Sequence, residues 1–192
     1  RVWLKRERLN GRIRLADKII LEVLNLLAEL TSLDRDRTFP QEEIDRLLMT
    51  RFDFTRSEAE DFGSDFKVCC FLGRDQRDCY KFLHDSFREY FFATALQKYI
   101  NDRNLEILRK TFISIEVSRF LVEGLTNRTE IVEFLRNIIQ TEKGSNYLLT
   151  NSMMLYELII QNQNEIHDFY TRLSSNQSNS VSKIYTLPSN FV

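Results

Sequence analysis

The sequence predicts a mostly α-helical protein with one short β-hairpin. Apolar residues recur every three or four positions along most of the 192 residues, which is the spacing of helices with one buried face. Only residues 68–83 differ, because two short apolar runs there flank a polar turn. With 43% hydrophobic residues, 5 Gly and 2 Pro, the composition supports a packed core and excludes a disordered or collagen-like chain.

Three helices are predicted ahead of the hairpin, over residues 13–32, 40–49 and 57–67. Pro40 suits the first turn of the second helix, because its missing N–H would have no partner there. Ser57 and Glu60 have the spacing of a capping box, in which each side chain bonds a free backbone donor near the other residue. The third helix is therefore expected to begin at Ser57.

The hairpin and the helix after it complete an ordered set of elements. Strands are predicted over residues 68–72 and 79–83. Ser86 and Glu89 form a second capping-box pattern, ahead of a helix that should reach residue 100. Its aromatic side chains are expected in the core: Phe87, Tyr90, Phe91 and Phe92. Three helices, a two-stranded wing and a further helix are the order of a winged-helix domain, which we assign to residues 13–100.

The second half is predicted to be a small helical bundle over residues 101–175. Five short helices are expected there, at 105–113, 115–125, 130–141, 147–161 and 165–173. Asn127 is expected to be the N-cap of the third of these. At the ends of the chain, residues 1–12 are expected to be a basic connecting segment and residues 176–192 a linker or tail.

Charge and composition narrow the possible functions. Lys+Arg 27 against Asp+Glu 28 gives a net charge of -1, so no overall field attracts the chain to nucleic acid or an anionic membrane. No apolar run approaches the ~18 residues of a membrane span, and no secretory signal pattern is present. Three cysteines without framework spacing fit a reducing compartment. We expect a soluble, cytoplasmic protein and, because the chain starts at Arg1, a fragment of a longer one.

DNA binding, the common use of a winged helix, is not favoured by the local charge. Residues 34–67 hold six basic against ten acidic side chains, a net -4. Four acidic residues lie on the helix that would enter the major groove: Glu58, Glu60, Asp61 and Asp65. Phosphates would repel this segment, so nucleic acid is not an expected partner. A winged-helix DNA-binding regulator with a helical dimerisation domain remains the alternative.

One motif in the sequence resembles a known family. Seven residues fit the pattern F-x-H-x-S/T-F-x-E-Y/F-x-x-A: Phe82, His84, Ser86, Phe87, Glu89, Tyr90 and Ala93. This resembles the segment that closes the winged-helix domain of NACHT-type STAND ATPases, which are signalling NTPases of bacterial defence and animal innate immunity. The tripeptide from Leu83 to Asp85 is also similar to the Met-His-Asp signature of the plant relatives, with Leu in place of Met.

The resemblance implies that His84 binds the β-phosphate of ADP held by a nucleotide-binding domain of the same polypeptide. Its position supports this independently, because His84 lies between the second strand and the following helix. A helix start has unpaired N–H groups and partial positive charge, which favour a nearby anion. A purely local structural role for His84 is the alternative. Glu89 is expected to be a capping-box carboxylate rather than a catalytic base.

The sequence holds no G-x-x-x-x-G-K-[ST] phosphate loop and no strand that ends in paired acidic residues. The chain is therefore not expected to be an enzyme or to hold a cofactor of its own. The resemblance implies a parent protein that binds ADP or ATP with Mg²⁺ and can oligomerise. This chain would then be a regulatory lever in a two-state signalling or defence switch, with no membrane partner.

The remaining candidates for chemistry are three cysteines and a second histidine. Cys69, Cys70, Cys79 and His84 are potential zinc ligands, but adjacent cysteines on a strand point to opposite faces, so a shared site is not expected. No oxyanion-stabilising loop accompanies them, so a thiol nucleophile is not expected either. We expect the cysteines to be small buried hydrophobic residues, and His167 to lie at the surface of a helix.

Overall fold

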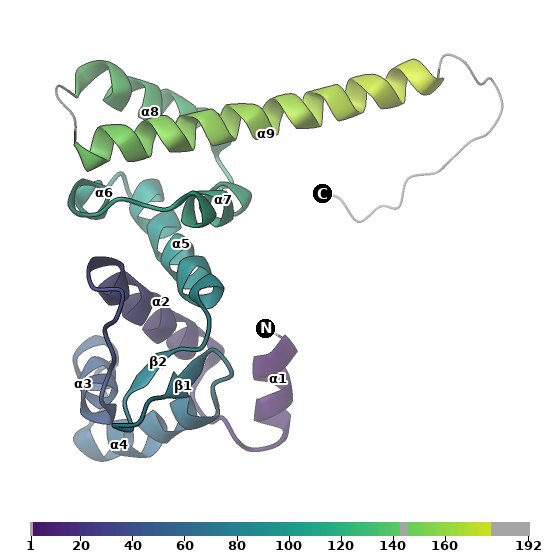
Figure 1. The fold of residues 1–192 in the computed structure, drawn as a ribbon. Helices are drawn as coiled ribbons and strands as arrows, with labels where there is room; N and C mark the ends of the chain where they lie inside the picture. Colours follow the sequence, from purple (N-terminus) through teal and green to yellow (C-terminus); the bar gives the residue numbers. More distant parts are fainter. Residues whose placement is uncertain (1, 143–145, 178–192) are drawn as a thin grey trace.

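The structure is a computed structural model that describes residues 2–142 and 146–177. Over these residues the chain is mostly helical with one two-stranded antiparallel sheet, which confirms the predicted fold class. Figure 1 shows two groups of elements joined by α5 (Asp85–Asn101). The first group is α1 (Val2–Leu9), α2 (Asp17–Leu33), α3 (Gln41–Phe52), α4 (Arg56–Gly63), the 3-10 helix η1 (Ser64–Val68), β1 (Leu72–Arg74) and β2 (Tyr80–Phe82). The second is α6 (Glu106–Lys110), α7 (Ile115–Glu123), α8 (Arg128–Thr141) and α9 (Tyr147–Gln177).

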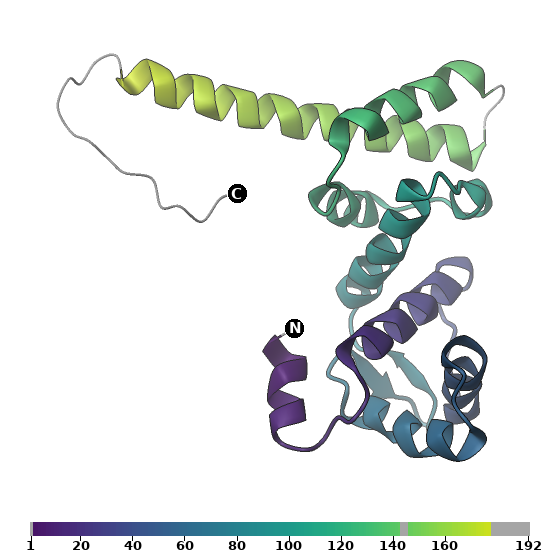
Figure 2. The same cartoon turned by 180° about the vertical axis from the view of Figure 1, so that it is seen from behind.

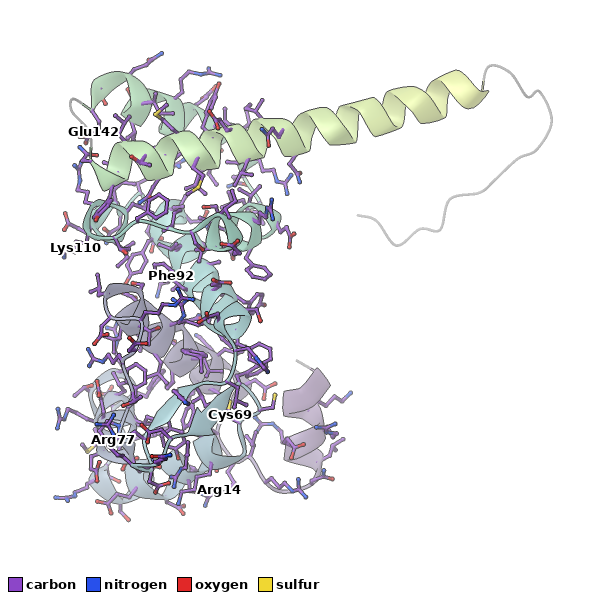
Figure 3. All side chains as sticks on the ribbon, in the orientation of Figure 1. Arg14, Cys69, Arg77, Phe92, Lys110 and Glu142 are labelled. Carbon is purple, nitrogen blue, oxygen red and sulfur yellow. The ribbon has the colours of Figure 1, made fainter. Side chains whose placement is uncertain are left out.

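Helix α2 has the wide apolar face that its sequence predicts, and this face packs against α5. The helix begins at Asp17, four residues later than expected, because the backbone before it is held by another segment. Asp65 of η1 accepts hydrogen bonds from the backbone N–H groups of Arg14 (2.7 Å) and Leu15 (2.8 Å). Figure 3 shows Arg14 beside α4, at the end of the molecule farthest from α9. Helix α1 occupies most of residues 1–12, and the assignment of these residues as a connecting segment stays a prediction.

The predicted capping box at Ser57 and Glu60 is wrong, and the real one lies two residues earlier. Thr55 is the N-cap of α4: its hydroxyl accepts from the N–H of Glu58, and the Glu58 carboxylate accepts from the N–H of Thr55 at 2.9 Å. The helix also ends at Gly63 instead of residue 67, and the chain tightens into η1. A Cβ at Gly63 would lie 2.1 Å from Asp45 Oδ1 of α3, so a larger residue there would force the Asp45 side chain to move.

The wing is shorter than predicted and has an additional partner. Strand β1 pairs with β2 in the register Leu72↔Phe82, Gly73↔Lys81 and Arg74↔Tyr80. The expected strand at 68–72 is wrong, because the N–H groups of Cys69 and Leu72 make local turn bonds instead of pairing across the sheet. Phe39 exchanges two backbone hydrogen bonds with Tyr80, of 2.8 and 2.7 Å, so β2 lies between β1 and the segment before α3.

Helix α5 joins the two halves of the molecule. One side packs on α2, where the Tyr99 hydroxyl bonds the Glu29 carboxylate at 2.9 Å, and another side packs on α7. The buried apolar residues form one cluster that extends from Ile13 to Ile159. The division of the chain at residue 100 stays a prediction, since α5 contributes to the core on both sides of it.

The second half is helical where helices were predicted, but two of the predicted helices are joined into one. Residues 147–161 and 165–173, predicted as two helices, are parts of the single helix α9. The intervening residues 162–164 include neither Gly nor Pro, so nothing there stops the helix. Both views show the C-terminal half of α9 extending away from the other helices (Figures 1 and 2). Most of the predicted tail, residues 178–192, lies outside the described residues.

Asn127 precedes α8 as predicted, but its side chain makes no capping hydrogen bond within the described residues. The two helices before α8 are shorter than predicted: α6 is Glu106–Lys110 and α7 is Ile115–Glu123. None of the helices in the described ranges combines the length and apolar character that a bilayer crossing requires.

Candidate functional site

His84, the predicted sensing residue, is exposed at the junction between β2 and α5. It is the N-cap residue, with extended backbone (φ -139°, ψ 144°). Its carbonyl accepts from the N–H groups of Phe87 (3.1 Å) and Arg88 (3.4 Å), and among the described residues its side chain makes no capping bond. The imidazole meets the Phe87 ring edge to face, with centroids 5.5 Å apart. The carbonyl therefore accepts the first hydrogen bonds of the helix, and the ring nitrogens take no part in capping it.

The predicted capping box at Ser86 and Glu89 is wrong because the helix begins at Asp85, so Ser86 lies inside the first turn. The Glu89 side chain is 15% exposed and lies 3.8 Å from the Arg88 guanidinium. Burial raises the pKa of this carboxyl above its ordinary value, and the nearby carboxylates of Glu116 and Asp85 add to the rise against the opposing effect of Arg88.

Replacing Glu89 with glutamine should slightly stabilise the chain at neutral pH. A carboxyl whose pKa is raised in the folded state favours folding below its unfolded pKa, and this contribution is lost as pH rises toward the folded pKa. Glutamine has no charge to bury, so its advantage should be present at pH 7 and absent at pH 4 in urea unfolding. The exposed Glu133 of α8, changed to glutamine, is the control. A Glu89→Gln variant that is less stable at pH 7 would show that the ion pair with Arg88 stabilises the fold more than burial of the charged carboxylate destabilises it.

Apolar side chains are exposed near the start of α5. Leu83 is 49% exposed and Tyr90 is 50% exposed. Leu83 precedes the helix and its side chain lies close to Gly73 of the wing, whereas the half-buried Phe87 and Tyr90 are three residues apart on α5. The prediction that Tyr90 is in the core is wrong, because half of its surface is exposed and its ring packs edge to face on Phe120 of α7. Phe91 and Phe92 are buried as predicted, and Figure 3 shows Phe92 on α5 between the two groups of elements.

The chain matches no family model, no curated protein and no solved structure. A family assignment therefore depends only on the motif residues and on their structural environment.

The three cysteines lie in and before the wing and differ in burial. The expectation that they are buried is confirmed for Cys69 and wrong for Cys70, which is exposed, and Cys79, which is half-buried; all three are free thiols. Burial raises the pKa of Cys69 to about 12, so it is a neutral thiol at physiological pH. Within residues 2–142 and 146–177 there is no group of three or more His, Cys, Asp or Glu residues that could hold a metal ion. His167 lies in α9, and its side chain is outside the described set.

Sequence reasoning did not single out Arg88, a charged residue within the motif whose side chain is largely buried. Its side chain is only 14% exposed, and its guanidinium lies 3.4 Å from Asp85 and 3.8 Å from Glu89. Asp85 is also paired with Arg35, from the connection between α2 and α3. No sequence signal predicts this cluster, because Arg35 and Asp85 are 50 residues apart.

Proposed function

We propose that this chain is the regulatory part of a NACHT/STAND-type NTPase. In this proposal the winged helix docks on a nucleotide-binding domain of the same polypeptide and senses bound ADP through His84, as part of a cytoplasmic signalling or defence switch. The observation that supports it most is the exposed imidazole at the start of α5, which makes no capping hydrogen bond among the described residues.

The surroundings of His84 suit a docked phosphate. The start of a 17-residue helix has free backbone N–H groups and partial positive charge, and a neutral or protonated imidazole can donate a hydrogen bond to a phosphate oxygen. Leu83, just before α5, and Tyr90, on α5, expose apolar surface, and a docking domain would cover it. Nucleic acid is a less suitable partner, because Glu58, Glu60 and Asp61 are exposed on α4.

Helix α5 provides a route by which docking can affect the second half of the chain. It packs on α2 and on α7, and the core is continuous across it. A shift of α5 must therefore be accommodated by α7 and α9, because close-packed interiors deform little. ADP can bias such a switch only by its difference in affinity for the two states, and the bond to His84 would supply that difference in the closed state.

The test is His84→Ala in the full-length parent protein. Loss of a hydrogen bond to a charged phosphate should speed ADP release by at least about tenfold and raise basal signalling. Nucleotide content of the purified protein and the ADP dissociation rate give the measurement. Ser86→Ala, which changes an exposed side chain in the same turn, is the control. Unchanged ADP retention in His84→Ala would contradict the proposal, provided that the melting temperature of the variant is also unchanged.

A further inference from the structure

A polar cavity lies near the start of α5 and does not include His84. Its volume is about 220 Å³, and its walls come from the end of α2, the connection to α3, the wing and the first turn of α5. Four cationic side chains line it: Arg35, Arg37, Lys81 and Arg88. Water takes about 30 Å³ per molecule in the liquid, so the cavity has room for several waters or for one tetrahedral oxyanion.

Three carboxylates also line the cavity, and two of them have partners that hold them in place. Asp85 pairs with Arg35, and this pairing lowers the pKa of the Asp85 carboxyl. Asp75 accepts from the backbone N–H groups of Arg77 (2.8 Å) and Cys79 (2.9 Å) in the wing turn. The third is Asp36, which is exposed. Four cations and three carboxylates line the cavity, but Arg37 also pairs with Glu43 and the Arg88 guanidinium lies 3.8 Å from Glu89, so attraction of an anion would come from the placement of the cations and not from an excess of charge.

Arg88 is the donor whose hydrogen-bonding capacity is least satisfied. Its Nε is buried and has no hydrogen-bond partner among the residues that the structure describes. The ion pairs of its terminal nitrogen, at 3.4 and 3.8 Å, are longer than charge-assisted hydrogen bonds of about 2.8 Å. The Nε atom is fully buried and does not face the open space of the cavity, so a bound ion would contact the terminal nitrogens of Arg88.

We propose that this cavity binds a phosphate group, with Arg88 as the main donor and Lys81 and Arg37 as further cationic contacts. The partial positive charge at the start of α5 adds to the attraction. The site is independent of the proposed nucleotide sensing, because its residues all belong to this chain and His84 is not among them.

The test is isothermal titration calorimetry of the 192-residue chain with inorganic phosphate and, separately, with pyrophosphate. Sodium chloride holds the ionic strength constant. We expect saturable binding, with the tighter of the two ions identifying a single phosphate or a diphosphate as the natural group. Arg88→Gln should weaken binding by at least about tenfold. Lys81→Gln, at an exposed position of β2, should weaken it by about two- to fivefold.

Two control variants test whether phosphate binding is specific to the residues of the cavity. Arg56→Gln removes an exposed arginine of α4 outside the cavity and should leave the affinity unchanged. His84→Ala should also leave it unchanged. The proposal is overturned if phosphate has no effect beyond that of chloride, or if neither Arg88→Gln nor Lys81→Gln weakens binding. It is equally overturned if only His84→Ala removes binding, a result that would favour the proposed nucleotide sensing instead.

Discussion

Replacing Asn151 with alanine is expected to lower the free energy of unfolding by about 3 kcal/mol, because three buried backbone groups lose their partner. Asn151 of α9 is fully buried. Its amide nitrogen donates to the carbonyls of Leu108 (3.0 Å) and Thr111 (2.8 Å), and its oxygen accepts from the N–H of Ile113 at 3.1 Å. Urea unfolding followed by circular dichroism gives the measurement.

The control is Asn137→Ala on the exposed face of α8, which should change stability by less than about 0.5 kcal/mol. The loss at Asn151 should also loosen the connection between α6 and α7, where Thr111 bonds the Ser32 carbonyl of α2 at 3.2 Å. Amide hydrogen exchange of residues 108–114 should therefore quicken in Asn151→Ala. A loss below about 1 kcal/mol would show that water replaces the amide bonds at little cost.

The sequence predicts the helices well where one apolar face decides the structure, and less well where a single polar contact decides it. The core of α2 follows from the repeat of its apolar residues, whereas its first residue depends on Asp65, about fifty positions away. The strand predicted before residue 72 failed for a similar reason, because local turn bonds at Cys69 and Leu72 compete with pairing. Boundaries depend on contacts that periodicity does not encode.

Capping boxes illustrate the limit of short motifs. Thr55 and Glu58 have the same spacing as Ser57 and Glu60, so spacing alone does not choose between them. At α5 the carbonyl of His84 caps the helix, and the Ser86 pattern is left within the first turn. The motif did predict that His84 lies between the wing and the helix. The motif contained no information about the cavity beside Arg88, because residues from four separate segments of the chain line that cavity.

Replacing Asp65 with alanine is expected to destabilise the chain by about 3 kcal/mol and to release the segment before α2. The side chain is 2% exposed, and one of its oxygens accepts both the Arg14 and Leu15 N–H groups. Without it, two backbone donors near the buried side chains of Ile13 and Leu15 lose their partner. The measurements are urea unfolding and trypsin cleavage between Arg6 and Arg14, which should become faster than in the unmodified chain.

Two variants distinguish the contribution of the buried hydrogen bonds of Asp65 to stability from that of the ion pairs with Arg14. Asp65→Asn keeps one oxygen that can accept both N–H groups, so it should lose less stability than Asp65→Ala. Asp61→Ala removes only the exposed ion pair with Arg14, of 2.7 Å, and should cost less than about 1 kcal/mol without a change in cleavage. Equal losses for Asp61→Ala and Asp65→Ala would instead mean that the Arg14 guanidinium holds this segment, and that the two backbone hydrogen bonds contribute little.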